Sequence, residues 1–244
     1  MSKVPSILIA VPGAGYECSK AYMAFGSMVG GTVHYWMKRY GVDAQVAVRV
    51  TDRMSVAEAR NLLMGVALSN DFDYVLWLDD DMDPPPNIVE RLMRFDRPIV
   101  SGCASKRCIP PEVMAFDFFP DKETGETKCF QGSIPLWKGT YAMGGAGMAC
   151  VLMRTEVLKY AREKLGHRVF QYGEDPVTGT RKYSTEDLLF FETVNAGGFR
   201  TIIDSECSVG HLGIHNFLPN TADVESGKYH NPEAAHYVGS SPGC

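Results

Sequence analysis

The feature that most constrains this chain is the stretch YVLWLDDDMDPPP, which covers residues 74–86. The apolar run at 74–78 is short, continuous and bounded by turn residues, which is typical of a strand buried on both faces. Three consecutive aspartates follow, so they lie at the carboxyl end of that strand, where open α/β sheets bind ligands. Because adjacent carboxylates repel one another, we expect a divalent cation that also holds a polyanionic ligand.

The first part of the chain alternates between strand and helix patterns. Ser55 and Glu58 stand three apart ahead of an apolar run, as in the capping box that starts a helix. The predicted strands cover 7–11, 45–50, 74–78 and 98–102, and the predicted helices cover 19–40, 55–68 and 87–94. This β-α-β-α-β-α-β order predicts an α/β fold whose mixed, mostly parallel sheet is flanked by helices.

The pattern changes after residue 103. Residues 110–138 contain short aromatic segments broken by Pro and Gly, which indicates a small antiparallel element. Further on we predict strands at 146–153 and 199–203 and helices at 155–164 and 184–195. We interpret residues 1–244 as one domain with a nucleotide-binding half (1–102), an acceptor half (103–215) and a polar tail or flap (216–244).

Charge and cysteine content exclude some classes of protein. The formal net charge of -5 argues against general nucleic-acid binding, because phosphate backbones attract basic faces. Seven cysteines without CxxC pairs, behind a short polar start, indicate free thiols in a reducing compartment. No segment approaches the ~20 apolar residues of a membrane span. We therefore expect a soluble, cytoplasmic protein, and the sequence does not predict its oligomeric state.

The aspartates are candidate metal ligands. Side chains alternate along a strand, so we expect Asp79 and Asp81 on one side and Asp80 on the other. Two carboxylates plus substrate phosphates would complete the shell of Mg²⁺ or Mn²⁺. His211 is a candidate third ligand because imidazole suits Mn²⁺. The alternatives are a solvated acidic turn for the aspartates and an ordinary loop position for the histidine.

A calcium loop is a further interpretation of the same aspartates. Its positions 1, 3, 5 and 12 would be Asp79, Asp81, Asp83 and Glu90. Pro84, however, stands where that loop needs glycine, and the preceding segment has the pattern of a strand.

A second constellation lies in YSTEDLLFF, at residues 183–191. Asp187 is a candidate general base, although acidic residues in the first turn of a helix are also explained by the helix dipole. Glycines in the segment 143–148 either let a ligand approach the backbone closely or form a turn before a strand.

These pieces, in this order, resemble the GT-A glycosyltransferases, and the large family 2 type in particular. LIAVPGAG resembles the first strand and nucleotide loop, AEARNLL the helix before the metal strand, and WLDDDMDP the DxD motif. GGAGMACVLMR resembles the acceptor-side segment, TEDLLF the segment that supplies the base, and His211 the late histidine that completes the metal shell. The matching pieces are spread over most of the chain.

The resemblance implies a hexosyltransferase of the GT-A (Rossmann-like) fold that moves one sugar from a nucleotide-diphosphate sugar to a hydroxyl acceptor. Among such donors it favours a UDP-sugar. It implies Mn²⁺ or Mg²⁺ held by Asp81 with Asp79 and His211, and Asp187 as the base that gives inversion. The implied donor-binding residues are Val11, Pro12, Gly13, Thr51, Asp52, Arg60, Asn61 and Asp80. The implied acceptor-side or sugar-binding residues are Gly144, Gly145, Ala146 and Glu186. The acceptor can be a glycan, a protein or a small molecule.

Other functions remain open at this stage. The chain lacks the QxxRW segment of processive members, which favours transfer of a single sugar. Retaining GT-A enzymes that use GDP- or UDP-sugars share the DxD motif and the late histidine. A nucleotidyltransferase would show a basic first loop, and residues 12–16 contain no basic residue. The remaining alternatives are a nucleotide-sugar-binding module without activity and a zinc hydrolase that uses His211, His215 and the aspartates.

Overall fold

The computed structural model describes residues 4–13, 19–108, 111–122, 127–132, 139–174 and 179–212, together with the backbone of 236–239. The predicted tail at 216–244 and His215 lie outside the described residues, except for that last short strand.

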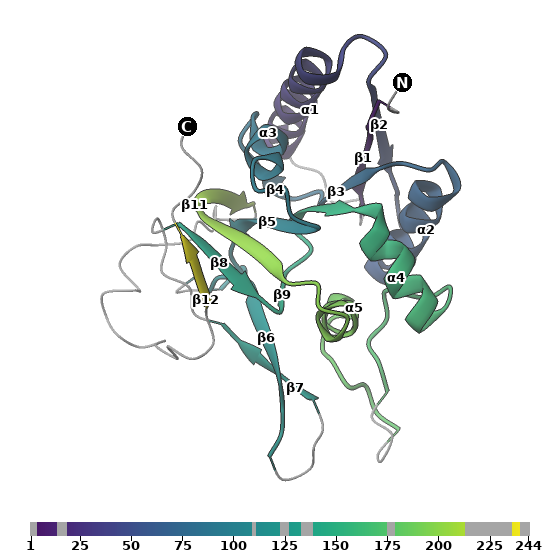
Figure 1. Cartoon of the computed structure of the whole chain (residues 1–244), viewed down its shortest axis with the longest axis vertical. Helices are drawn as coiled ribbons and strands as arrows, with labels where there is room; N and C mark the ends of the chain where they lie inside the picture. Colours follow the sequence, from purple (N-terminus) through teal and green to yellow (C-terminus); the bar gives the residue numbers. More distant parts are fainter. Residues whose placement is uncertain are drawn as a thin grey trace.

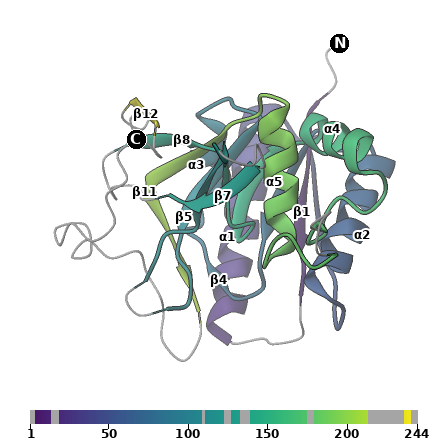
Figure 2. The same cartoon turned by 90° about the horizontal axis from the view of Figure 1, so that it is seen from below.

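A large mixed sheet forms the centre of the molecule. Its strand order is β12-β8-β11-β5-β10-β3-β1-β2, and β4 pairs with the end of β11. The bounds are β1 (Ser6–Val11), β2 (Gln45–Val50), β3 (Tyr74–Leu78), β4 (Met82–Asp83), β5 (Ile99–Ala104), β8 (Thr140–Met143), β10 (Cys150–Arg154), β11 (Thr201–His211) and β12 (His236–Gly239). Figure 2 shows the sheet running from β12 and β8 at one edge toward β1, which lies next to the other edge strand, β2.

The part of the sheet that carries the aspartates combines parallel and antiparallel pairing. β1 pairs in parallel with both β2 and β3, and β5 pairs in parallel with β11. Between these two groups lies β10, which is antiparallel to both β3 and β5. The predicted α/β class with a mixed, mostly parallel sheet is confirmed, and the strand predicted at 146–153 is the antiparallel one.

A second, smaller sheet has the order β7-β6-β9, with β6 at Ala115–Pro120, β7 at Thr127–Gln131 and β9 at Gly145–Ala146. Its strands are antiparallel, and the β6–β7 hairpin projects from the body of the molecule (Figure 1). This is the small antiparallel element that the broken aromatic segments at 110–138 predict.

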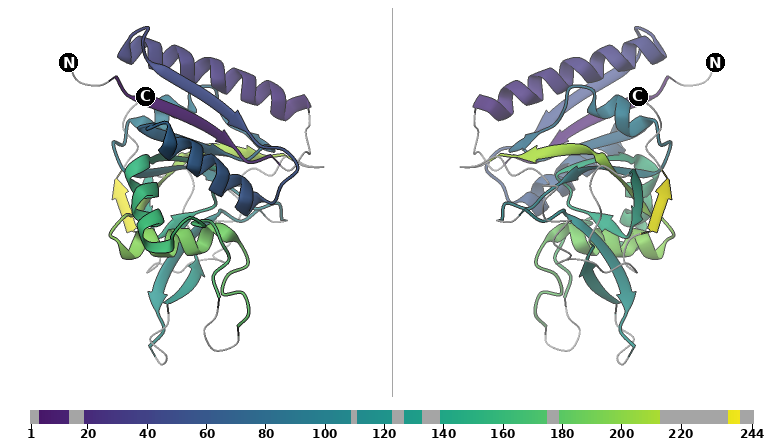
Figure 3. Two further views of the ribbon diagram at one scale, coloured as in Figure 1. Left: turned by 90° about the vertical axis from the view of Figure 1, so that its right-hand side faces the viewer. Right: turned by 90° about the vertical axis from the view of Figure 1, so that its left-hand side faces the viewer.

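Helices cover both faces of the large sheet (Figure 3). On one face lie α1 (Ser19–Tyr40) and α3 (Ile88–Met93), and on the other lie α2 (Val56–Ser69), α4 (Thr155–Leu165) and α5 (Glu186–Ala196). In β3, Leu76 and Leu78 pack on the α1 side, whereas Val75 and Trp77 pack on the α2 side. Each face buries apolar area at about 25 cal/mol per Å², which is why the strand sequence is apolar throughout.

Local sequence explains two helix positions near the site. The Ser55 hydroxyl accepts a hydrogen bond from the backbone N–H of Glu58 at 3.3 Å and donates to its carboxylate at 2.8 Å, which confirms the capping box. In α1, a Cβ on Gly31 would lie 2.0 Å from the carbonyl oxygen of Pro86. Glycine therefore lets α1 run without interruption against the proline segment that follows the aspartates.

The strand predicted at 199–203 is longer than expected and begins later. β11 extends to His211, with a shift in its register against β5 between Asp204 and Ser208. His211 therefore ends a strand, and its interpretation as an ordinary loop histidine is wrong, because β11 pairs there with β4. Among the described residues, no helix combines the length and apolar character needed to cross a membrane.

Candidate active site

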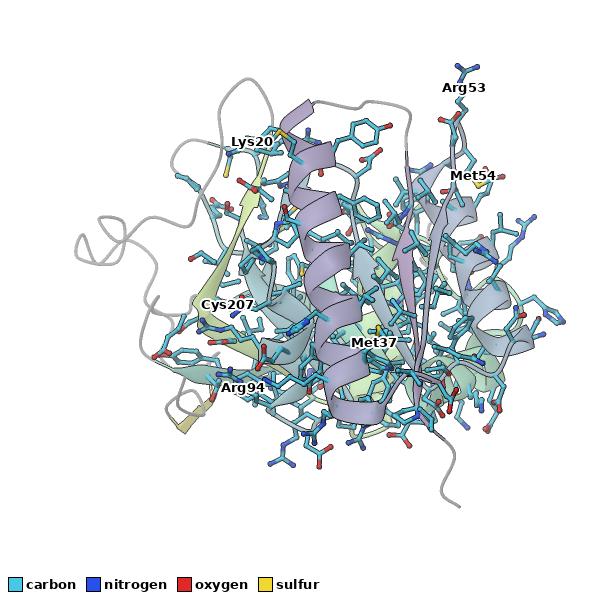
Figure 4. All side chains as sticks on the ribbon, turned by 90° about the horizontal axis from the view of Figure 1, so that it is seen from above. Lys20, Met37, Arg53, Met54, Arg94 and Cys207 are labelled. Carbon is cyan, nitrogen blue, oxygen red and sulfur yellow. The ribbon has the colours of Figure 1, made fainter. Side chains whose placement is uncertain are left out.

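Polar residues gather at the edge of the sheet where the parallel strands end. β1 leads to Gly13, β2 to Thr51, β3 to Asp79, and β5 to Ser105, while β11 ends at His211. In Figure 4, Lys20 at the start of α1 and Arg53 after β2 both lie at this edge. Carboxyl ends of parallel strands meet at one edge, so the fold itself concentrates these side chains.

Asp81 and His211 form a pair across this edge. Both carboxylate oxygens of Asp81 lie 3.2 Å from Nε2 of His211, and the backbone N–H of Leu212 donates to the Asp81 carbonyl at 2.7 Å. Nδ1 of His211 lies 2.9 Å from the Ser105 carbonyl oxygen, so that bond directs Nε2 at the carboxylate. Backbone and side chain together therefore fix this pair.

The pair is electrostatically coupled. Burial alone would raise the pKa of Asp81, but the hydrogen bond to His211 and the charges of His211 and Arg107 outweigh it, so the pKa is lowered. For His211, burial lowers the pKa, while the bonds to Asp81 and Ser105 raise it and prevail. Arg107 contributes directly, because its Nη1 lies 3.0 Å from Oδ2 of Asp81.

Asp79 belongs to a different cluster, centred on the buried Arg60 of α2. Strand alternation carries Asp79 to the α2 face, where Arg60 donates to its Oδ1 at 2.8 Å. A second nitrogen of Arg60 pairs with Glu186 at the start of α5. Burial raises the pKa of Asp79 and of Glu186, and the nearby Arg60 acts in the opposite direction on both. Asp79 and Asp81 therefore have separate cationic partners.

Asp187 lies beside this cluster, with one oxygen engaged and one not. Its Oδ2 accepts a hydrogen bond from the backbone N–H of Met148 at 3.3 Å. Its Oδ1 is buried and has no hydrogen-bond partner among the described residues. The residue is 6% exposed. A buried acceptor without a partner costs free energy, so this oxygen suits a hydroxyl donor supplied by a ligand.

The other side of β3 opens on a shallow apolar hollow, whose cavity volume is about 60 Å³ and whose total empty space of about 450 Å³ includes open solvent. Asp80 alternates to this face, opposite to Asp79. The hollow is lined by Val11, Ala21, Tyr22, Phe25, Val50, Leu78, Asp79, Asp80 and Met82. Tyr22 and Val50 are half-exposed. An apolar hollow with a few carboxylates at one end has the character of a small-molecule site.

The ends of β1 and β2 lie close together next to this hollow. The backbone N–H of Gly13 donates to Oγ1 of Thr51 at 3.2 Å, and a Cβ at Gly13 would lie 2.4 Å from the Thr51 carbonyl oxygen. Glycine is thus required at position 13 for close approach of the two strand ends. Pro12 is buried beside it, and Asp52 points outward toward Arg53 at 3.5 Å.

Some predicted site residues have structural partners instead. The Asn61 side chain donates to the Phe170 and Ala57 carbonyls, both at 2.8 Å, and accepts from the Phe170 N–H at 3.0 Å. It therefore anchors the segment after α4, and its role in donor binding stays a prediction.

The glycine-containing segment is packed as tightly. A Cβ at Gly144 would lie 2.7 Å from Phe118 of β6, and one at Gly145 would lie 2.5 Å from Phe191 of α5. Ala146 is buried in β9. Close packing between the small sheet and α5 explains these glycines, and their acceptor-side role stays a prediction.

Four residues at this edge were not predicted from the sequence: Ser105, Arg107, Tyr22 and Phe25. Ser105 follows a predicted strand, so the rule that ligands bind at carboxyl ends indicated its position. The sequence carries no comparable indication for the other three, because their approach to the site depends on how α1 and the loop after β5 pack.

The residues present can hold a divalent cation with two protein ligands. Among the described residues no group of three His, Cys, Asp or Glu side chains could hold a metal ion. Asp81 and His211 alone present carboxylate oxygens and an imidazole nitrogen to one point. Mg²⁺ and similar ions commonly take one or two protein ligands and complete the shell with phosphate and water. The pair therefore fits such an ion together with a phosphorylated ligand.

The calcium loop is not formed. The side chain of Asp83 pairs with Lys20 at 2.8 Å, and Glu90 on α3 lies 3.6 Å from Arg94. The segment before the aspartates is the strand β3, whereas such a loop follows a helix.

Comparisons with known proteins agree with an α/β fold. The model of the Anp1 family matches residues 39–121, which include α2 and the three aspartates but neither Asp187 nor His211. No curated protein matches the chain.

Solved structures resemble the fold at low sequence identity. A197 from STIV is 16% identical with a TM-score of 0.50, and the match covers 88% of this chain and 94% of that one. The nucleoside-diphosphate-sugar pyrophosphorylase from Vibrio cholerae RC9 is 13% identical with a TM-score of 0.38, covering 81% and 90%. The catalytic domain of Drosophila beta1,4galactosyltransferase 7, in a complex with xylobiose, is 16% identical with a TM-score of 0.41, covering 98% and 76%.

Proposed function

We propose that this protein is a metal-dependent glycosyltransferase that moves one sugar from a nucleotide-diphosphate sugar to a hydroxyl acceptor. The observation that carries the proposal is the meeting of Asp81 and His211 at the carboxyl edge of the sheet, between an apolar hollow and a buried carboxylate with a free oxygen. The match to the Anp1 family, whose members are GT-A-like mannosyltransferases, supports the same class of reaction.

In this proposal the donor occupies the hollow and reaches Asp81 and His211, which we call the metal pair because they would hold the ion. The nucleobase and ribose enter between Val11 and Asp80, under the start of α1. The diphosphate then extends toward Asp81 and His211, which hold Mn²⁺ or Mg²⁺. That ion supplies positive charge where the leaving diphosphate gains negative charge as the sugar–oxygen bond breaks.

Asp187 acts on the acceptor. A hydroxyl that reaches the free Oδ1 donates its proton there while Met148 holds the other oxygen by its backbone N–H. The deprotonated oxygen attacks the anomeric carbon opposite to the diphosphate, which inverts the configuration. Arg60 pairs with both Asp79 and Glu186, whereas Oδ1 of Asp187 has no hydrogen-bond partner among the described residues and is the acceptor we assign to the hydroxyl.

Donor hydrolysis tests the proposal. We expect release of nucleoside diphosphate from at least one member of a panel of UDP- and GDP-sugars, including GDP-mannose, in Mn²⁺ and its loss in EDTA. The Anp1 match makes mannose donors the first candidates, ahead of the UDP-sugars that the motifs alone favour. Absence of turnover, together with absence of calorimetric binding for every donor, would contradict the proposal.

The same assay separates the alternatives. A nucleotidyltransferase releases pyrophosphate, a binding module binds a donor without turnover, and a zinc hydrolase requires bound zinc but no nucleotide. Proton NMR of the first product formed distinguishes inversion from retention, and a retained configuration would remove Asp187 from the role of base.

Asp187→Asn is the sharpest variant. Asparagine keeps the shape and the bond from Met148 but cannot accept the proton, so we expect transfer to fall at least about 100-fold. Mn²⁺-dependent binding of the nucleoside diphosphate should not change. Glu192→Gln is the matched control, because Glu192 lies on the same helix and pairs with Lys182 at 2.8 Å. Unchanged transfer in Asp187→Asn would show that the base is another group.

A further inference from the structure

The loop after β5 brings a cation to the metal pair. Arg107 Nη1 lies 3.0 Å from Oδ2 of Asp81, and the same oxygen lies 3.2 Å from Nε2 of His211. Both carboxylate oxygens of Asp81 lie 3.2 Å from Nε2 of His211, so an ion bound to Asp81 and His211 would lie close to the Arg107 guanidinium. Two cations at one carboxylate repel each other, so Arg107 and the ion would compete for Asp81.

The described backbone on either side of residues 109–110 is hydrogen-bonded, while the Arg107 side chain is half-exposed. Lys106 N–H donates to the Glu112 carbonyl at 2.7 Å, and Met114 N–H donates to the Ala104 carbonyl at 2.9 Å. Ser105 lies two residues before Arg107, and its carbonyl oxygen contacts Nδ1 of His211. The backbone keeps Arg107 near the pair, and more than half of its side chain faces solvent, so an exposed ion pair of modest strength holds the guanidinium in place.

We propose that Arg107 is a phosphate-binding residue. In the ligand-free protein its guanidinium pairs with Asp81, and when the metal ion binds, the side chain turns so that the guanidinium pairs with the donor diphosphate instead. The proposal rests on the function proposed above. A diphosphate on the ion lies within a few ångströms of Asp81, inside the reach of this long side chain. A guanidinium matches phosphate oxygens in two parallel hydrogen bonds, so the released side chain has a better partner there.

If Arg107 changes partner from Asp81 to the diphosphate, removing its side chain should raise the affinity for Mn²⁺ and lower the affinity for the nucleotide. Arg107→Ala removes the competing cation, so calorimetry should show Mn²⁺ alone binding roughly 3- to 5-fold tighter, as expected for loss of a half-exposed ion pair. In saturating Mn²⁺, UDP or GDP, whichever binds the unmodified protein, should bind at least about 10-fold more weakly. Arg107→Lys keeps the charge but not the fork, so it should restore part of the nucleotide affinity.

Lys106→Ala is the matched control. Lys106 is adjacent in the loop, and its ammonium pairs with Glu112 at 2.9 Å rather than with the aspartates. Neither affinity should change in this variant, and circular dichroism checks that all three variants are folded.

Two results would overturn the role of Arg107. One is an unchanged nucleotide affinity in Arg107→Ala, and the other is weaker Mn²⁺ binding, which would make Arg107 a support for the metal pair. Failure of the proposed function looks different, because the unmodified protein would then bind neither nucleotide with Mn²⁺.

Discussion

Arg60 is a buried cation shared by carboxylates from two other elements. It is 4% exposed and bonds to Asp79 of the β3 end and to Glu186 of α5, with Asp187 nearby. Arg60→Met keeps most of the side-chain volume but leaves these carboxylates uncompensated. We expect urea unfolding at pH 7 to show a loss of about 3–5 kcal/mol, the usual cost of breaking a buried ion pair on one side.

The pH dependence of that loss has a definite sign. Burial raises the pKa of Glu186 and Arg60 opposes the rise, so without Arg60 the folded-state pKa rises further. A carboxyl whose folded pKa exceeds its unfolded value binds more protons when folded, so stability declines as pH rises. The penalty of Arg60→Met should therefore shrink from about pH 7 toward about pH 4.5.

Arg53→Met is the control for this pair of measurements, because the Arg53 side chain is exposed and pairs only with the exposed Asp52. It should change stability by no more than about 0.5 kcal/mol at either pH. A penalty for Arg60→Met that stays constant with pH would show that lost packing, rather than uncompensated charge, causes the destabilisation.

Sequence reasoning at the residue scale anticipated some of the side-chain contacts at this end of the sheet and missed others. It predicted Asp81 with His211 and placed Asp80 opposite to Asp79, because strand alternation and motif order are local properties. It assigned Arg60 to the nucleotide, whereas the structure pairs it with Glu186, which lies 126 residues away in sequence. A partner at that separation depends on how α2 and α5 pack, and neither helix carries that information alone.

At the scale of elements, α1 depends on one of its two adjacent glycines. A Cβ at Gly31 would meet the Pro86 backbone, whereas a Cβ at Gly30 meets nothing within 4 Å. Gly31→Ala should therefore destabilise the protein by about 1–3 kcal/mol, because backbone atoms must shift. Gly30→Ala should stabilise it by about 0.5–1 kcal/mol, because alanine favours a helix.

Denaturant unfolding of the two variants side by side measures both effects. The comparison is tight, since the substitutions are identical and adjacent in one helix. Equal effects for the two would show that α1 does not approach the segment after the aspartates as closely as described.

Element bounds followed from local chemistry, but element placement did not. The bounds of β3 and the capped start of α2 agree with prediction, because an apolar run and a Ser–Glu pair act within a few residues. The insertion of β10 between β3 and β5 is a long-range choice, which strand patterns do not encode. The extension of β11 to His211 was missed because its last residues are polar, and pairing with β4 stabilises them.

At the scale of the whole molecule, the contact between Asp81 and His211 joins two distant parts of the chain. Asp81 and His211 are 130 residues apart, and they meet because β3 and β11 both end at the carboxyl edge of one sheet. An ion and a nucleotide held there would cross-link the early and late halves of the sheet. Binding should therefore stabilise the entire fold rather than one loop, since unfolding of either half destroys the site.

Thermal unfolding measures this stabilisation directly. With Mn²⁺ and the nucleoside diphosphate at about 100 times Kd, linkage adds about 2.7 kcal/mol. For a chain of this size that corresponds to a rise in Tm of roughly 5–10 °C.

His211→Ala removes one of the two protein ligands, so the ligand-induced rise should fall below about 2 °C. His34→Ala, at an exposed position of α1, should keep the full rise. Because each rise is taken relative to the same variant without ligand, a change in intrinsic stability does not affect the comparison. A full rise in His211→Ala would place the ion elsewhere and remove the link between the two halves of the sheet.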